Sequence, residues 1–484
     1  MVQSGTLVRA RAGGGVSFAA GHLGELTQIV TPSLVDAVLA KTGRVQLRIR
    51  KLPSRVVVYF VLAMALFTEY GYRGVWACLV AGAGLPDVDP SAAALRQARR
   101  RVGSAPLAAL FDEVKGAAAA ADTSGSWWRG LRVVAWDGTG LQVPDSPENL
   151  AVCGRAAGKF GLGGFPLMRL TALVECGTRT LIDAIVGPWK QSEKDQALLL
   201  CRALRPGMLV LADRGSKGVP LACAAATTGA HLLWRTSTDR LPPVLHLLPD
   251  GTYLSMATSQ NERARLARWT RHRRGIPPQA QGLALRVIEA TVTVRTDGRH
   301  RRTTRLRLIT TLLDHEQYPA TELAELYHER WQAETAYLGL KVTLRGPGRV
   351  LRSHTFDGAR QELFGLLIVY QAARLIAADA AGQAGIDPDR ISLTVTLRTA
   401  RLTVLSATGA AATSVTSPTP WIRRAILHPR ELGPAHRRLR ILPRRVKRPI
   451  STFAYNTTRK DPPFPNPEIV IAIGVPADLP RRPV

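Results

Sequence analysis

Acidic residues are scarce in this sequence. Among its 484 residues it has 36 Asp and Glu against 65 Lys and Arg, which gives a formal charge of +29. The shortage of acids argues against a cationic partner. The basic excess favours a polyanion instead, and nucleic acid is the commonest polyanionic partner of proteins.

Cysteines and long apolar runs are also scarce. The five cysteines stand at least 22 positions apart, so the sequence has no C-x-x-C zinc site, and we interpret them as buried residues in a reducing cytosol. The most apolar run, 56–67, has 12 residues, whereas about 20 are needed to span a bilayer. The sequence therefore predicts a buried core helix there and no membrane association.

The first 125 residues are predicted to be helical. Thr31-Pro32 has the form of an N-cap followed by proline at the first helical position, and Ser91 is a second N-cap. Arginines share one side of the helix after Ser91, and further basic residues precede the apolar run. Such a face suits phosphate contacts, although a merely solvated face gives the same pattern. The candidate DNA contacts of this region are Arg50, Lys51, Arg99 and Arg100.

A different periodicity follows the helical region. Apolar, β-rich runs cover 131–136, 167–175, 180–186, 207–212 and 231–236, and helical patterns cover 193–204 and 217–229. The order β-β-β-α-β-α-β indicates a mixed α/β sheet. Turn-rich and β-like segments over 240–305 indicate an inserted subdomain, and a long helix is predicted from 319 to 346.

Two aspartates stand at the ends of predicted strands. Asp137 follows an apolar strand and precedes Gly138-Thr139, and Asp213 follows another and precedes Arg214-Gly215. The carboxyl end of a strand, next to a tight turn, is a common place for catalytic groups. Simple loop capping gives the same pattern, so each aspartate alone leaves both interpretations open.

The long helix carries a strip of polar side chains. The strip consists of Tyr327, Arg330, Glu334 and Lys341. At 100° per residue these positions fall within an arc of roughly 60°, along about 20 Å of helix. One interpretation is a docking strip for a long anion, and the other is an ordinary solvated surface with paired charges.

Glu334 adds a third carboxylate to the two aspartates. Three carboxylates at one place repel each other unless divalent cations neutralise them. Oxygen ligands alone favour Mg²⁺, with Mn²⁺ as a substitute. Two such ions can activate a hydroxyl and stabilise the leaving oxygen in phosphodiester displacement. The predicted metal ligands and catalytic residues are Asp137, Asp213 and Glu334.

These motifs resemble those of the DDE transposases of bacterial insertion sequences, in the group named after insertion element four. The resemblance rests on Asp137-Gly138-Thr139, on Asp213-Arg214-Gly215 and on the pattern Tyr327-x2-Arg330-x3-Glu334-x6-Lys341. Shorter motifs agree with it: Arg50-Lys51-Leu52-Pro53, 97–103, 163–166 and 351–354. The resemblance covers roughly residues 23–380.

The resemblance implies an α/β fold: an RNase H-like mixed-sheet catalytic core with a β-strand insertion, preceded by an all-α N-terminal DNA-binding domain. The implied domains are 1–125 (N-terminal), 126–239 and 306–402 (core), 240–305 (insertion) and 403–484 (linker and basic C-terminal arm). The three carboxylates would hold two Mg²⁺ ions. Tyr327, Arg330 and Lys341 would grip phosphates near the cleaved end, and Trp234, Trp269 and Trp331 are candidates to hold a flipped base.

The implied activity is DNA transposition. We expect the protein to bind the terminal inverted repeats of its element, cleave the DNA ends and join the 3′-hydroxyls to target DNA. Expected partners are double-stranded DNA and a second copy of the chain, in a cytoplasmic, nucleoid-associated setting. The alternatives are a catalytically inactive transposase-derived DNA-binding protein and an RNase H-like nuclease with another substrate.

Overall fold

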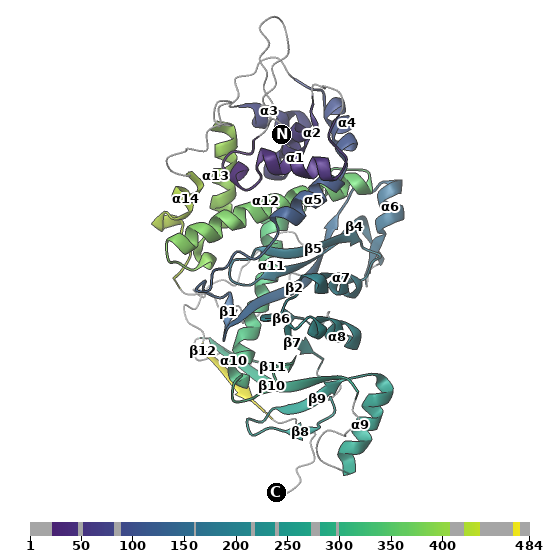
Figure 1. The fold of residues 1–484 in the computed structure, drawn as a ribbon, viewed down its shortest axis with the longest axis vertical. Helices are drawn as coiled ribbons and strands as arrows, with labels where there is room; N and C mark the ends of the chain where they lie inside the picture. The colour runs from purple at the N-terminus through teal and green to yellow at the C-terminus, as the bar shows by residue number, and fades with distance from the viewer. Residues whose placement is uncertain are drawn as a thin grey trace, which may run out of the picture. The chain divides into compact units, whose positions relative to one another are not determined.

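The structure is a computed structural model in which the chain forms two compact units (Figure 1). The residues described are 22–46, 52–81, 89–158, 161–213, 218–237, 242–272, 281–296, 300–406, 421–435 and 468–474. Unit 1 comprises Met1–Arg129, Trp136–Ala203 and Gln332–His436, and unit 2 comprises Gly130–Ala135, Leu204–Trp331 and Arg437–Val484. The chain therefore passes from one unit to the other within a strand and within a helical segment.

Short helices form the first part of unit 1. They are α1 (Pro32–Lys41), α2 (Ser54–Leu66), α3 (Tyr72–Val80), α4 (Ala92–Val102) and α5 (Ala105–Val114), after a 3-10 turn at Leu26–Gln28. The hydroxyls of Thr31 and Ser91 accept the N–H groups of Leu34 and Ala94, which confirms both predicted N-caps. Residues 56–66 of α2 are all buried, which confirms the predicted core helix.

The long helix α12 (Phe356–Gln383) is the core of unit 1. Helices α2, α5 and α13 (Leu393–Ser406) pack on it, and α14 (Trp421–Ile426) packs on α13 (Figure 1). Gly365 allows the close approach of α2, because a Cβ there would lie 3.1 Å from Cγ1 of Val61. Of the helices in the described residues, α12 alone is long and apolar enough to cross a membrane, but it is mostly buried, as a core helix is.

The strands of unit 1 are β1 (Trp127–Trp128), the second part of β2 (Leu131–Gln142), β3 (Arg155–Gly158), β4 (Gly161–Glu175) and β5 (Leu181–Pro188). They include two antiparallel pairs, β3 with β4 and β4 with β5. β4 pairs with β5 on one side and neighbours β2 on the other. Helices α6 (Pro147–Cys153) and α7 (Glu193–Leu200) pack on β4 and β5. The β3–β4 hairpin was not predicted, because its glycine-rich sequence has no strand periodicity.

The strands of unit 2 begin with a parallel set. The first part of β2 pairs in parallel with β6 (Met208–Ala212), and β6 pairs in parallel with β7 (His231–Thr236). Helix α8 (Val219–Thr227) connects β6 to β7 and packs on β7. The elements β2, β4, β5, α7, β6, α8 and β7 follow in the predicted order. The sheet contains both antiparallel and parallel pairs. This confirms the mixed α/β fold that follows a helical N-terminal region.

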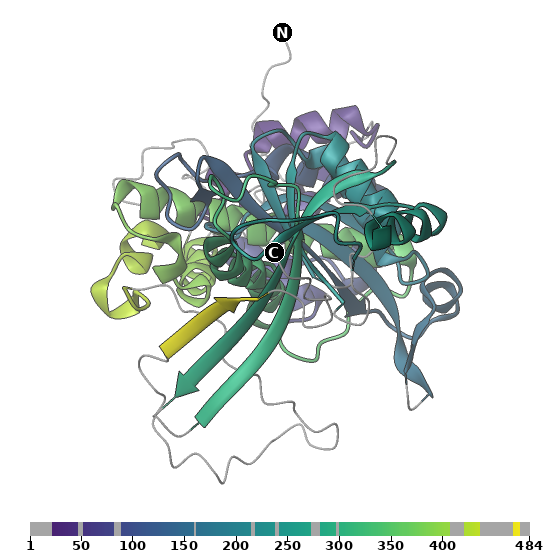
Figure 2. The same cartoon turned by 90° about the horizontal axis from the view of Figure 1, so that it is seen from below.

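The insertion extends from the same strands of unit 2. It contains β8 (His246–Leu247), β9 (Tyr253–Ala257), α9 (Gln260–His272), β10 (Leu283–Thr296) and β11 (His300–Thr310). β10 and β11 form a long antiparallel pair, and β11 also pairs with β7. A strand from the C-terminal region, β12 (Glu468–Ile473), pairs with β10; it is the yellow arrow beside the long strands in Figure 2.

The segment predicted as one long α-helix is not a regular helix. It consists of α10 (Ala320–Leu326), a 3-10 turn at Tyr327–Arg330, α11 (Trp331–Leu338) and a π-helical turn at Gly339–Leu344. The prediction of a single arc of side chains was wrong for this reason, because 3-10 and π turns do not advance by 100° per residue. The segment also leaves unit 2 and enters unit 1 between Trp331 and Gln332.

Candidate active site

Asp137 lies inside β2 in unit 1, directly after buried strand residues. The prediction that the strand ends at Asp137 was wrong, because β2 continues through Gly138 and Thr139 to Gln142. Its Oδ1 atom accepts the N–H of Gly138 at 2.9 Å. Its backbone carbonyl accepts the hydroxyl of Tyr337, and that hydroxyl in turn accepts the N–H of Ala172 at 3.0 Å. The phenol of Tyr337 therefore ties α11 to β2 and β4 at the position of the aspartate.

Tyr337 stays neutral over a wide pH range. Burial raises the pKa of its hydroxyl well above the usual value, and the negative charges of Asp137 and Glu193 raise it further. A neutral phenol keeps the proton that it donates to the Asp137 carbonyl. This hydrogen bond is made to the backbone of Asp137 and does not involve its carboxylate.

A second contact docks the same helical segment on β2. Lys341 Nζ donates to Thr139 Oγ1 at 3.0 Å, two residues beyond Asp137. Burial and the nearby Arg345 both lower the pKa of Lys341. Glu334 is half-buried and lies one turn before Tyr337, and residues three apart share a helix face. The face that carries Glu334 is thus the one that docks on 137–139.

Asp213 lies directly after β6 in unit 2 and is half-buried. The hydroxyl of Tyr327 donates to the carbonyl of Ala212, the residue before Asp213, at 3.1 Å. Tyr327 is only 7% exposed, and burial raises its pKa above the usual range. Arg330 opposes that rise through its charge and a hydrogen bond, whereas the charge of Asp213 adds to it.

The side chains of the predicted strip have different surroundings. Arg330 is 6% exposed, and its guanidinium lies 5.6 Å from the ring centre of Trp331. Tyr327 and Arg330 are therefore buried beside Asp213 in unit 2, whereas Glu334 and Lys341 are half-buried in unit 1. Their contact with phosphates stays a prediction.

The three predicted metal ligands belong to different units. Asp137 and Glu334 are in unit 1, and Asp213 is in unit 2. Within the described ranges, no three His, Cys, Asp or Glu side chains lie close enough to hold a metal ion. In the strand register, Ala135 of β2 pairs with Leu211 of β6. Asp137 comes two positions after Ala135, and Asp213 comes two positions after Leu211.

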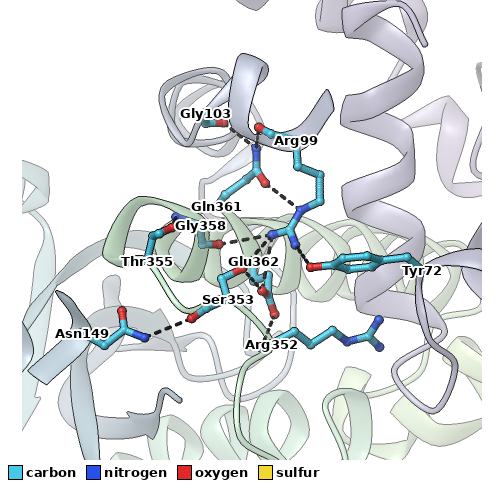
Figure 3. Close-up of polar contacts among 10 residues, drawn as sticks. All are labelled: Tyr72, Arg99, Gly103, Asn149, Arg352, Ser353, Thr355, Gly358, Gln361 and Glu362. Carbon is cyan, nitrogen blue, oxygen red and sulfur yellow. Dashed lines mark hydrogen bonds and ion pairs between the residues drawn. The ribbon is translucent and has the colours of Figure 1, made fainter. Parts of the chain in front are cut away.

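The predicted N-terminal DNA contacts differ in exposure. Arg50 and Lys51 lie outside the described residues. Arg99 is only 4% exposed, and Figure 3 shows its guanidinium inside a polar network. It donates to Tyr72, Ser353, Gly358, Gln361 and Glu362. Arg99 thus joins α4 to the start of α12, whereas Arg96 and Arg100 are exposed on the same helix.

The sequence reasoning did not identify Tyr337 as part of this site. The spacing of Tyr337 could have indicated it. Tyr337 stands three residues after Glu334 and four before Lys341, and residues three or four apart are neighbours on a helix. The three tryptophan candidates differ in their surroundings. Trp234 is buried on β7, Trp331 is half-buried beside Arg330, and the side chain of Trp269 lies outside the described residues.

Two protein-family models match this chain. Residues 20–112 match the insertion element 4 transposase N-terminal family, and residues 128–372, just over half of the chain, match the transposase DDE domain. The chain belongs to the insertion element 4 family of DDE transposases. The predicted family is confirmed, and the mixed sheet of this transposase is an RNase H-like core.

Individual relatives agree with this membership. The transposase InsG for insertion sequence element IS4 of Escherichia coli (strain K12) is 27% identical over 365 residues, which are 73% of this chain and 76% of the relative. A solved piggyBac transposase, in a synaptic complex with hairpin DNA, matches with a TM-score of 0.43 and 9% identity over 83% of each chain. That likeness is too weak to support an argument about this site.

Proposed function

We propose that this transposase binds the terminal inverted repeats of its own element, cleaves the DNA ends and joins the 3′-hydroxyls to target DNA. The observation that carries the proposal is the docking of one helical segment on β2. Tyr337 bonds to the carbonyl of Asp137 and Lys341 bonds to Thr139. This docking turns the face that carries Glu334 toward the strand that carries Asp137.

The register of the parallel strands supports a third carboxylate at the same place. Ala135 and Leu211 are paired, and Asp137 and Asp213 come two positions after Ala135 and Leu211, respectively. Catalytic groups are common next to the carboxyl ends of neighbouring parallel strands. We therefore propose that Asp137, Asp213 and Glu334 act together.

The donor set fits Mg²⁺, with Mn²⁺ as a substitute. All three candidate ligands offer carboxylate oxygens, which these hard cations prefer, and no His or Cys stands among them. When bound, two ions would polarise the attacking hydroxyl or water and neutralise the leaving oxygen. Residues of this chain prepare the ligands: the Gly138 N–H bonds to Oδ1 of Asp137, and the Tyr337 phenol holds its backbone.

Cationic side chains would hold the DNA. The Lys341 ammonium lies beside Thr139, two residues from Asp137, where it would attract a phosphate next to the reacting one. In unit 1 a cavity of about 650 Å³ is lined by Arg96, Arg100, Arg352 and His354, among others. With Arg99 buried, the exposed Arg96 and Arg100 are the proposed contacts of α4 with the DNA backbone.

The proposed oligomeric state and cellular location follow from the proposed reaction. Two element ends must be held together for transposition, so we propose a homodimer in the complex with DNA. The substrates are chromosomal, which places the active protein in the cytoplasm, on the nucleoid. The net charge of +29 supports association with such a polyanion.

A cleavage assay tests the proposal. The purified protein, supplied with Mg²⁺ and linear DNA that carries its own terminal repeats, should nick the ends and join them to target DNA. Glu334→Gln should reduce cleavage by about a thousandfold or more, because it removes a metal ligand, while repeat binding is retained. Normal cleavage by the variant would overturn the site. Repeat binding without cleavage by the wild type would indicate an inactive DNA-binding descendant.

A further inference from the structure

A small cavity of unit 1, about 180 Å³ in volume, is lined by three arginines. They are Arg345, Arg349 and Arg352, and they follow the helical segment that carries Glu334. Of the described residues that line the cavity, one is acidic, Glu362, and apolar residues of α2 and α12 complete the lining. Cations therefore outnumber acids around the cavity, which favours an anionic ligand.

Two of the three arginines have carbonyl partners just after the end of α2. Nη1 of Arg349 and Nη2 of Arg352 donate to the carbonyl of Thr68, at 2.6 and 2.8 Å. The C-terminal end of a helix carries a partial negative charge, which attracts such cations. Arg349 and Arg352 thus stabilise the end of α2, although Nη1 of Arg352 is buried and has no hydrogen-bond partner among the described residues.

Arg345 has no comparable partner. It is only 8% exposed, and no described residue accepts a hydrogen bond from its buried Nε or Nη1 atom. Burial lowers the pKa of Arg345, and no carboxylate of the described residues counteracts this. A buried cation without an acceptor is costly in free energy. An anion in the cavity would supply the acceptor that the described part of the chain does not.

Arg345 also lies near the candidate active site of unit 1. It stands four residues after Lys341, and its charge lowers the pKa of Lys341. Lys341 itself donates to Thr139, two residues from Asp137. Two cations that disfavour each other's charge are stabilised when an anion lies near both. An anion bound by Arg345 would therefore also be attracted by Lys341.

The small cavity shares two lining residues with a larger one. Both cavities are lined by Thr68 and Arg352, and Figure 3 shows that the guanidinium of Arg352 points away from the Glu362 carboxylate. The larger cavity, of about 650 Å³, is also lined by the exposed Arg96 and Arg100. Cations thus follow one another from α4 to the candidate active site. Such a row suits the regularly spaced phosphates of a DNA strand better than a single free anion.

We propose that Arg345, together with Arg352, binds one backbone phosphate of the element-end DNA in this cavity. A guanidinium offers several N–H donors in a planar fork, which matches two oxygens of a phosphate. This role rests on the proposed function, since the phosphate belongs to the DNA that is cleaved. It also explains the buried position of Arg345, whose missing acceptor would come from the DNA.

Binding of repeat DNA without divalent cations tests this role apart from cleavage. Affinity is measured at several salt concentrations for the full-length wild type and for Arg345→Met, which removes the charge and keeps a long side chain. We expect binding to weaken by about 10- to 100-fold, as on loss of charged hydrogen bonds. The slope of log affinity against log salt concentration should become shallower by about 0.9, the contribution of one phosphate. The matched control is Arg398→Met, an exposed arginine paired with Glu431 outside both cavities, which should bind as the wild type does.

Stability separates this role from a structural one. Replacement of a structural arginine by Met lowers the urea midpoint of unfolding, whereas replacement of an unpaired buried cation leaves it unchanged or raises it. We expect Arg345→Met to unfold at the wild-type midpoint or above. A lower midpoint together with wild-type DNA binding would overturn the proposal. Arg345→Lys is a second variant that keeps the charge and loses the fork, so it should keep the wild-type salt slope but bind more weakly.

Modified DNA identifies the ligand. A neutral methylphosphonate in place of one phosphate should weaken wild-type binding at one position of the repeat and cause no further loss in Arg345→Met. Losses of equal size in both proteins at every position would overturn the contact. A free anion is the other occupant that the experiment can detect. If inorganic phosphate raises the urea midpoint of the wild type alone while both proteins bind DNA equally, the cavity holds a free anion and the DNA contact is overturned.

Sequence preference separates the two proposals. If the wild type binds repeat DNA no better than unrelated DNA of the same length, recognition of the terminal repeats is overturned, and with it the proposed function. If the wild type prefers the repeats and Arg345→Met binds them equally well, only the role of Arg345 is overturned. Preference in the wild type with weaker binding by the variant supports both proposals.

Discussion

In unit 1 the backbone carbonyl of Asp137 accepts the hydroxyl of Tyr337, and in unit 2 the carbonyl just before Asp213 accepts the hydroxyl of Tyr327. Both tyrosines come from one segment, 327–341, which leaves one unit and enters the other. A tyrosine hydroxyl thus fixes the backbone of each aspartate-bearing segment, inside β2 at Asp137 and at the last residue of β6 before Asp213. A neutral buried phenol can hold the backbone there without competing for the carboxylate.

Cations of different exposure lie near the two aspartates. Lys341 is half-buried and bonded to Thr139, two residues after Asp137, whereas Arg330, near Asp213, is almost fully buried. A half-buried lysine can still reach a ligand. A buried arginine has less access to a ligand, so we expect substitutions at the two positions to have different effects.

The largest expected contrast is between Arg330→Met and Lys341→Met. Arg330→Met removes a buried cation that is hydrogen-bonded to Tyr327, so the free energy of unfolding should fall by about 2–3 kcal/mol. Lys341→Met should change the free energy of unfolding by less than about 1 kcal/mol. It should also make the slope of log affinity against log salt concentration shallower by about the contribution of one phosphate contact. Urea unfolding and binding at several salt concentrations measure both. Equal losses of stability would remove the contrast.

A smaller contrast is expected between the two tyrosines. The hydroxyl of Tyr337 bonds to two backbone groups, the carbonyl of Asp137 and the N–H of Ala172. The hydroxyl of Tyr327 bonds to the carbonyl of Ala212 and to the flexible side chain of Arg330, which can find other partners more easily than a backbone group can. Tyr337→Phe should therefore cost about 2 kcal/mol of unfolding free energy and Tyr327→Phe about 1 kcal/mol. Urea unfolding of the two variants checks the order. A larger loss for Tyr327→Phe would contradict the bridging role of Tyr337.

The smallest effect concerns alkaline pH. Burial raises the pKa of both tyrosines in the folded protein above the unfolded value of about 10. The unfolded chain then loses these protons first, so their contribution to stability is complete below about pH 10 and falls as the pH rises beyond it. Each Phe variant should show a shallower loss of stability above pH 10 than the wild type. An unchanged slope in both variants would exclude this contribution.

The strands and their aspartates could be predicted from the sequence because local signals determine them. Apolar runs that lead into an aspartate, and caps such as Thr31 and Ser91, act within a few residues. The helical strip could not be placed in the same way. Its 3-10 turn directly precedes the passage from one unit to the other and its π turn follows α11, and neither has a local signature in the sequence.

Tertiary packing also decided the roles of single charged residues. The sequence placed Arg99 and Arg100 on one basic face, but only Arg99 points to the start of α12 and is buried there by Gln361 and Glu362 (Figure 3). Gln361 stands 262 positions after Arg99 in the chain, and contacts of this length are visible only in the structure.

The central claim is that Asp137 and Asp213 hold the same metal ions. Calorimetric titration of Mn²⁺ into the transposase bound to its repeat DNA tests it directly. The wild type should bind about two ions per chain, and Asp137→Asn and Asp213→Asn should each weaken binding by at least about tenfold while DNA binding persists. Wild-type Mn²⁺ binding by either variant would contradict the claim.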